Sequence, residues 1–262
     1  MAATSEAIKA GIWSAFKTRL YEMPVHLYFL TWLPNLILQT LFYTLIALFA
    51  GGPTMAQFAL VGNIVRLAAL PTCIQTTYHL VADREEGYLT YLVTTPVNLA
   101  ALLLGRSIFF SMEAILTVFI AAAILLPLAG ILPTVAGFML FSVVLAVICN
   151  SLSGLGLLVG SIVFRTRYDM VITSLVPQFL TIFCGVMIPL SMFPKWVARA
   201  VSFVPLTNGL AAVRNLLTGD LAGNAGLIAA ELAVGTAYWI LGFFILYCSV
   251  QYGRVRGSLE RF

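Results

Sequence analysis

Residues 121–126 read AAAILL, six consecutive small or apolar side chains. Strands of a membrane β-barrel alternate apolar and polar residues, so an unbroken run is not typical of that fold. The other structure that satisfies every backbone polar group inside a bilayer is the α-helix. The run lies within an apolar window at residues 103–128, long enough at roughly 1.5 Å per residue to cross a hydrocarbon core about 30 Å thick. We therefore expect an all-α membrane protein.

The composition of the whole chain predicts the same fold class. Of the 262 residues, 61% are hydrophobic and 9% charged, and the mean hydropathy is +1.01. A soluble domain has about 45–50% apolar and about 25% charged residues. Five further windows are long and apolar enough to span a membrane, at residues 27–50, 56–80, 132–163, 169–190 and 225–250. The sequence thus predicts a single polytopic domain with six transmembrane helices.

Basic residues predict how these helices are oriented. With the N-terminus in the cytosol, ten basic residues lie inside and three outside, which is the positive-inside pattern. The inner residues are Lys9, Lys17, Arg19, Arg84, Arg106, Arg165, Arg167, Arg254, Arg256 and Arg261, and the outer residues are Lys195, Arg199 and Arg214. We therefore expect a multi-pass protein of the cytoplasmic membrane with both termini in the cytosol. Anionic head groups explain the net charge of +4 without a nucleic-acid partner.

Residues 1–24 precede the first predicted span and carry an amphipathic pattern. Ile8, Ile12, Phe16 and Leu20 recur every four residues, while basic residues lie elsewhere on the helical wheel. This spacing is typical of a helix lying in the membrane interface, with its apolar face in the head-group boundary. We expect such a helix to end at Pro24. A continuous apolar core, which a cleavable signal peptide requires, is missing from this stretch.

Two more segments lie between predicted spans. Residues 83–100 begin Asp83-Arg84-Glu85-Glu86-Gly87-Tyr88 and contain charges that favour water over hydrocarbon, so they predict a surface for a cytosolic partner. We expect a helix at residues 84–97, with its acidic residues at the N-terminus. Residues 191–222 fit two short helices, one opening at Pro194 and one capped by Thr207 or Asn208, with Gly219 as a stop. Both are too short to span, so we expect a re-entrant or interfacial hairpin.

Several short motifs occur in order along the chain. They are Arg84-Glu85-Glu86-Gly87, Tyr91-Leu92, Thr94-Thr95-Pro96, Gly105-Arg106, Phe193-Pro194, Trp196, Pro205-Leu206-Thr207, Arg214 and Gly219. With six spans and an amphipathic N-terminal helix, the chain resembles the membrane subunits of ABC-2-type (type V) ATP-binding cassette exporters. Such subunits export drugs, antibiotics, lipids, lipid-linked glycans or polysaccharide, so the resemblance does not name the substrate.

The resemblance also implies partners and site residues. It implies a homodimer or heterodimer of permease subunits in the membrane lipid, bound to two cytosolic ATPase subunits that carry the ATP and magnesium. Coupling to the ATPase is implied for Arg84, Glu85, Glu86, Gly87, Tyr88, Tyr91, Leu92 and Pro96. An extracellular gate is implied for Phe193, Pro194, Trp196, Pro205, Leu206, Thr207 and Arg214.

The chain lacks the sequence patterns of a catalytic, metal or nucleotide site. There is no G-x-x-x-x-G-K-[ST], H-E-x-x-H or G-x-S-x-G, and His26 and His79 are isolated residues near the ends of separate spans. The four cysteines, Cys73, Cys149, Cys184 and Cys248, all fall in predicted spans, where we expect them to pack as small apolar residues. We expect no catalytic residue, metal or cofactor on this chain.

Two ionisable residues fall near the middle of predicted spans. An unpaired charge at that depth costs at least about 2.5 kcal/mol, so we expect Arg66 and Glu113 to form an ion pair. A direct contact with substrate is the alternative reading of both residues, and Glu231 is an alternative partner for Arg66. In the fourth span, Ser153, Gly156 and Gly160 form a stripe of small residues, typical of close helix packing within one subunit or across a dimer seam.

Two other functions compete with an exporter subunit. A secondary transporter or channel driven by an ion gradient would show inverted-repeat halves and several acidic residues in discontinuous helices near the membrane midplane. In this sequence only Glu113 is a clear acidic residue at that depth, which does not favour this alternative. A membrane-embedded enzyme would need a catalytic constellation. An ATPase encoded beside this chain would favour the exporter.

Overall fold

The computed structural model describes residues 2–22, 24–88, 98–128, 135–163, 169–218 and 224–256. Over these residues the fold is all-α, as the sequence predicts, and contains no strand. The elements are α1 (Ala2–Glu22), α2 (Val25–Leu27), a π-helical turn η1 (Tyr28–Trp32), α3 (Leu33–Glu85), α5 (Leu99–Leu128), α6 (Val135–Val163), α7 (Asp169–Phe183), a 3₁₀ turn η2 (Leu190–Met192), α8 (Lys195–Val201), α9 (Thr207–Thr218) and α10 (Asn224–Arg256).

Four stretches within the described ranges are long and apolar enough to cross a membrane: Leu30–Glu85, Leu99–Pro127, Met139–Val163 and Asn224–Gln251. The six predicted windows do not map one to one onto these helices. The windows at residues 27–50 and 56–80 both lie largely in α3, while the window at residues 169–190 holds α7, which is only 15 residues long.

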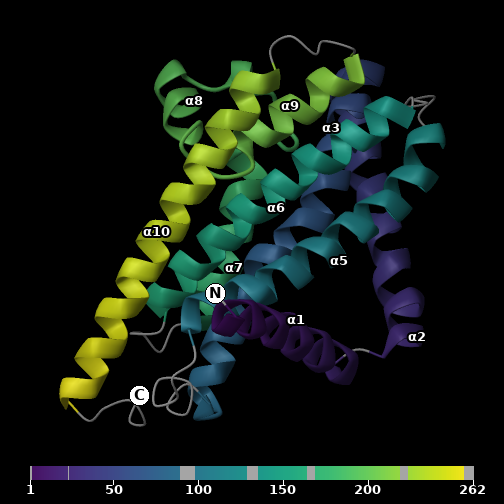
Figure 1. Ribbon diagram of the computed structural model, residues 1–262. Helices are drawn as coiled ribbons and strands as arrows, with labels where there is room; N and C mark the ends of the chain where they lie inside the picture. The colour runs from purple at the N-terminus through teal and green to yellow at the C-terminus, as the bar shows by residue number, and fades with distance from the viewer. Residues whose placement is uncertain are drawn as a thin grey trace.

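α3 folds back on itself at one residue. It has 53 residues, so a straight helix would be about 80 Å long, far more than the bilayer core of about 30 Å. Gly52 has φ 75° and ψ −170°, which is open to glycine and strained for other residues, and Pro53 follows it. Figure 1 shows the chain rise to one end of the bundle and return from it as two arms of α3.

α6 lies at the centre of the bundle, and its small residues allow close packing on both sides. A Cβ atom at Gly156 would lie 2.5 Å from the carbonyl oxygen of Cys73 on α3, and one at Gly154 would lie 2.9 Å from that of Gly235 on α10. No side chain fits at such distances. The stripe of small residues in the fourth window therefore packs helices within one chain, and Leu145, Ile148 and Leu152 of α6 fill the surrounding core.

α1 packs along α5 through its small residues. Its buried residues are Ala7, Gly11 and Ala15, spaced by four, whereas Phe16 and Leu20 of the predicted apolar face are exposed. A Cβ atom at Gly11 would lie 2.3 Å from the carbonyl oxygen of Leu102. Close backbone approach through small residues thus decides which face packs, because larger apolar side chains would hold the two helices apart.

The two short helices α8 and α9 lie at the end of the bundle opposite α1 (Figure 1). α8 begins after Pro194 and α9 begins at Thr207, which agrees with the boundaries that the sequence predicts. The N-terminal cap of α9 differs from the predicted one, which was Thr207 or Asn208. Asn208 donates its side-chain amide to the carbonyl of Ser202, and a residue of α10 caps α9 instead, as described below.

Candidate functional site

Arg106 ties three helices together at the start of α5. Its terminal nitrogens donate to both carboxylate oxygens of Asp83 near the end of α3, with Nη2 3.2 Å from Oδ1, and its Nε donates to the hydroxyl of Ser14 on α1 at 3.3 Å. Both charged side chains are mostly buried. A two-pronged guanidinium–carboxylate contact fixes orientation as well as distance. Residues 83–100 are called the coupling segment below, because the family resemblance implies that they contact the ATPase. The start of this segment is fastened to α1 and α5.

The first residues of the coupling segment lie directly beyond this contact. Glu85 is the last residue of α3, and the Glu86 amide donates to the carbonyl of Ala82. The acidic pair therefore stands at the C-terminus of α3, which corrects the expectation of a helix beginning at Arg84. Gly87, with φ 75°, turns the chain there, and Glu85, Glu86 and Tyr88 are exposed.

The structure describes the coupling segment up to Tyr88 and again from Asn98. Tyr91, Leu92 and Pro96 lie outside the described residues, as do Gly219 of the hairpin and the basic residues Arg165, Arg167 and Arg261. Their predicted roles stay predictions.

Glu113 pairs with a different arginine from the predicted one. Its Oε1 lies 2.8 Å from Nε of Arg19, near the end of α1. Arg66 instead donates to Asn63 at 3.3 Å and to Thr181 of α7 at 3.5 Å, and its guanidinium lies 5.4 Å from the centre of the Tyr43 ring. The predicted pair of Arg66 and Glu113 does not form, because α1 runs beside α5 and places Arg19 next to Glu113.

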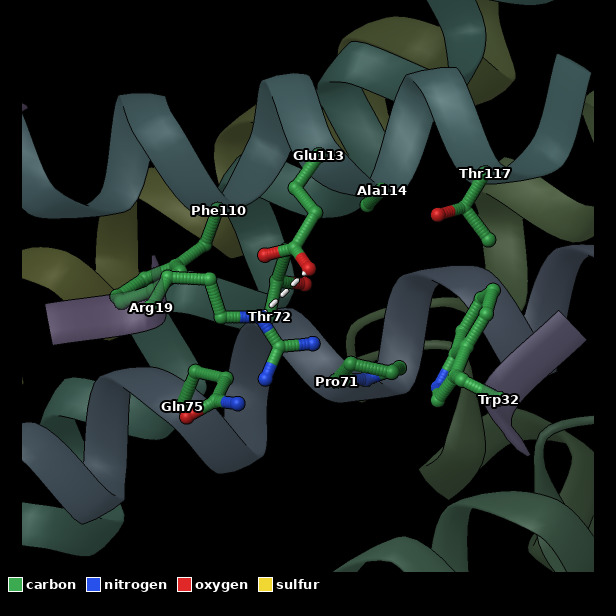
Figure 2. Close-up of a pocket in the computed structure, with 9 residues that line it drawn as sticks. All are labelled: Arg19, Trp32, Pro71, Thr72, Gln75, Phe110, Glu113, Ala114 and Thr117. Carbon is green, nitrogen blue, oxygen red and sulfur yellow. Dashed lines mark hydrogen bonds and ion pairs between the residues drawn. The ribbon is translucent and has the colours of Figure 1, made fainter. Parts of the chain in front are cut away.

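A pocket surrounds the ion pair of Arg19 and Glu113 (Figure 2). It lies among α1, η1, α3 and α5 and has a volume of about 20 Å³, which is room for about one water molecule. Its lining consists of Arg19, Trp32, Pro71, Thr72, Gln75, Phe110, Glu113, Ala114 and Thr117. Trp32 comes from the π-helical turn, and such turns are frequent at functional sites.

Glu231 of α10 holds the start of α9 at the other end of the bundle. Its side chain is completely buried, its Oε1 accepts the backbone N–H of Leu206 at 2.7 Å and the hydroxyl of Ser151, and its Oε2 accepts the N–H of Gly209 at 3.0 Å. A carboxylate at a helix N-terminus satisfies donors that have no partner inside the helix and is favoured by the helix dipole. Glu231 is thus engaged here and is not the partner of Arg66.

Leu206, in the predicted gate, has an uncommon backbone conformation. Its φ of 84° is the only positive value among the described residues other than glycine. A bulky side chain in that region is strained, and such strain persists only where surrounding contacts enforce it. Here the Leu206 side chain is fully buried and its N–H is held by Glu231.

Arg214 of α9 connects the hairpin to α3 and to the segment that follows α7. Its Nη2 donates to the carbonyl of Phe58 on α3 at 3.2 Å and to that of Val186, after α7, at 3.1 Å. The guanidinium lies 3.4 Å from the centre of the Phe58 ring, a cation–π distance. Burial lowers the pKa of Arg214 to about 9, so it stays cationic at neutral pH.

The other predicted gate residues divide into a buried and an exposed group. Pro205 and Thr207 are buried with Leu206, whereas Pro194 is exposed, Phe193 is partly exposed and the side chain of Trp196 is 74% exposed. The structure therefore buries Pro205, Leu206 and Thr207 at the start of α9, holds Arg214 against Phe58 and Val186, and leaves Trp196 on the surface.

Sequence reasoning missed the partners that hold these sites. Asp83 and Arg106 flank the charged segment with opposite charges, and this could have predicted their contact. Ser151 carried no signal, because a lone serine in an apolar helix is common. Within the described ranges, no group of His, Cys, Asp or Glu residues could hold a metal ion.

Comparison with known proteins adds the family. The model of the family described as ABC-2 type transporter matches residues 8–218, which include most of α1, the coupling segment and the hairpin up to the end of α9. No curated protein matches the chain. Because the match covers most of the sequence, the chain belongs to the ABC-2 type transporter family and is a membrane permease of an ABC transporter.

Proposed function

We propose that this chain is the membrane half of an ATP-driven exporter, and that separate cytosolic subunits bind and hydrolyse the ATP with magnesium. Two such ATPase subunits would bind a dimer made with a second copy or a paralogue of this chain. The substrate would be a hydrophobic or amphiphilic molecule, such as a drug, an antibiotic, a lipid or a glycoconjugate.

The contact of Arg106 with Asp83 and Ser14 is the observation that carries this proposal. It joins the chain entering the coupling segment, the chain leaving it and α1 through a few hydrogen bonds. A push on the exposed residues Glu85, Glu86 and Tyr88 therefore acts on three helices together. A two-state bundle responds to such a push by a shift in population between inward-open and outward-open forms.

The proposed topology has six crossings with both termini in the cytosol of the cytoplasmic membrane. The two arms of α3 would make two crossings, and α5, α6, α7 with its following segment and α10 would make the others. The opposite placement of α1 and the hairpin in the bundle supports this arrangement (Figure 1), as does the positive-inside pattern. The hairpin would then shape the outer gate.

Transport in proteoliposomes tests the proposal. The chain would be co-purified with its ATPase and reconstituted, and uptake of fluorescent amphiphiles and labelled lipids would be measured with no ion gradient. We expect uptake to require hydrolysable ATP and to fall several-fold in Glu86→Lys and Tyr88→Ala. Glu6→Lys, another exposed acid changed in the same way, is the matched control. Uptake driven by a proton or sodium gradient without ATP would favour the secondary transporter instead.

A further inference from the structure

The outward side of α8 is apolar and basic together. Met192, Trp196 and Phe203 are 64%, 74% and 69% exposed, although each is a large apolar side chain. Lys195 and Arg199 are exposed as well, and because they are four residues apart, with Trp196 three residues before Arg199, these three lie on one side of the helix. Exposed apolar residues that gather in one place mark an interaction site, whereas scattered ones need no explanation. We call these five residues the α8 patch.

The positive charge of the α8 patch has no acidic neighbour in the sequence. No Asp or Glu occurs between Met170 and Gly219. In the part of the chain that the structure describes, neither Lys195 nor Arg199 takes part in an ion pair. Opposite charges meet where two surfaces bind each other. We therefore expect the partner that covers this patch to carry negative charge.

The patch follows an apolar surface that begins on α7. Leu175, Phe179 and Ile182 are exposed and are spaced by four and by three, which places them on one outward face of α7. The ring of Phe183, at the end of α7, lies 6.0 Å from that of Phe193, at the start of the hairpin. On a membrane permease, such an outward apolar face is more stable against hydrocarbon than against water. The basic residues of α8 come directly after this face, at one end of the bundle (Figure 1).

We propose that the α8 patch binds anionic phospholipid head groups of the leaflet on the hairpin side, with their phosphates on Lys195 and Arg199 and with Trp196 at the level of the head groups. Aromatic residues at the boundary of a membrane, and basic residues that attract anionic lipids, are the usual form of such a contact. The contact holds the hairpin at the membrane surface. This inference rests on the membrane location that the family shows and not on transport or on the ATPase.

A second copy of the chain fits the α8 patch less well than lipid does. A two-fold dimer through this patch would set it against itself. Lys195 and Arg199 would then face the same two cations of the other copy, with no carboxylate from the surrounding sequence between them. Like charges brought together in an interface are costly. An acidic soluble protein would neutralise the cations, but it would not reach the outward face of α7 inside a bilayer.

A probe at Ala200 tests whether lipid covers the patch. Ala200 is exposed and lies four residues after Trp196, so Ala200→Cys in a cysteine-free full-length chain keeps all five patch residues. The cysteine would carry a nitroxide, and the chain would be placed in nanodiscs of phosphatidylcholine and phosphatidylglycerol in equal parts. We expect the nitroxide to be more accessible to oxygen, which dissolves in lipid, than to a nickel chelate, which stays in water. Trp196→Ser should raise access of the chelate several-fold, and Trp13→Ser, an exposed aromatic of α1, should not change it.

Lipids of different charge test the two cations. Phosphatidylglycerol or phosphatidylcholine, each with a nitroxide near its head group, would quench a fluorophore attached at position 200 instead. We expect stronger quenching by the anionic lipid, and Lys195→Gln and Arg199→Gln should each weaken its association about fivefold. Lys9→Gln, an exposed cation of α1 at the other end of the bundle, is the matched control and should leave the quenching unchanged. Each variant changes an exposed side chain, so folding should be retained.

Three results would overturn the proposal. Equal quenching by the two lipids would show that the cations do not bind anionic head groups. A label that is mainly accessible to the chelate would place α8 in water, and a label shielded from both oxygen and the chelate would show that protein covers the patch. ATP and transport enter none of these measurements, so the exporter proposal and this one can fail separately.

Discussion

Arg106 and Asp83, 23 residues apart, close the base of the exposed coupling segment through a two-pronged contact that also reaches α1 through Ser14. We expect Arg106→Lys to keep the charge but lose the fork, because an ammonium cannot donate to both carboxylate oxygens and to Ser14 in the same geometry. The free energy of unfolding in mixed micelles should fall by about 1–3 kcal/mol.

The control for this prediction is Lys9→Gln. Lys9 pairs with Glu6 on the surface, where both side chains are about 70% exposed, so its loss should change stability by less than about 0.5 kcal/mol. Equal losses in the two variants would show that the contact of Arg106 with Asp83 is an ordinary surface pair.

Gly105 and Gly11 form the contact between α5 and α1. A Cβ atom at Gly105 would lie 2.2 Å from the carbonyl oxygen of Ile8, and a backbone atom cannot move aside as a side chain can. Gly105→Ala should therefore lower stability by about 1–3 kcal/mol. Gly226→Ala in α10 is the matched control, since nothing lies within 4 Å of its Cβ position, and it should stabilise by up to about 1 kcal/mol. Thermal unfolding of both variants measures the difference, and a neutral Gly105→Ala would mean that α1 separates easily from α5.

Glu231 caps α9 from a neighbouring helix. Glu231→Ala should cost about 1–3 kcal/mol, because it leaves the buried N–H groups of Leu206 and Gly209 without their acceptor. Glu231→Gln keeps one acceptor oxygen and should cost less. Hydrogen exchange of the α9 amides would report the effect locally, with faster exchange expected at Leu206 and Gly209 in the alanine variant. Unchanged protection there would contradict the capping role.

Glu113 should couple energetically to Arg19 and not to Arg66. In a double-mutant cycle, Arg19→Gln and Glu113→Gln should show an interaction energy of at least about 0.5 kcal/mol, whereas Arg66→Gln and Glu113→Gln should be additive. Denaturation of the single and double variants gives both energies. The reverse result would restore the pair that the sequence favours.

The contrast between these two pairings shows what sequence reasoning could reach. The fold class followed from apolar runs such as residues 121–126, because backbone groups in a bilayer leave few alternatives. The pairing of Glu113 did not follow, since depth along one helix says nothing about which neighbour faces it. The interfacial apolar face of α1 stays a prediction, but its contact with α5 through Ala7, Gly11 and Ala15 did not follow from the sequence, because small residues spaced by four permit close packing without naming the neighbour.

In the hairpin, too, local features could be predicted from the sequence and long-range contacts could not. The starts of α8 and α9 could be predicted, because Pro194 and Thr207 act locally on the backbone. The cap from Glu231 could not, because it joins residues 25 apart through the packing of α10 on α6 and α9. The sequence offered Arg66 as a partner of Glu231, whereas the carboxylate accepts the backbone N–H groups of Leu206 and Gly209.

Cross-linking from Tyr88 measures the central claim, that the exposed end of α3 binds the ATPase. A photoactivatable cross-linker would be attached to Tyr88→Cys in a cysteine-free version of the chain, in complex with its co-expressed ATPase. Trp196→Cys is the matched control, since Tyr88 and Trp196 are exposed aromatic residues, 57% and 74% exposed, in the coupling segment and in the hairpin. We expect a cross-link to the ATPase from position 88 whose yield changes with ATP, and none from position 196. A cross-link from position 196, or none from position 88 in an intact complex, would contradict the account.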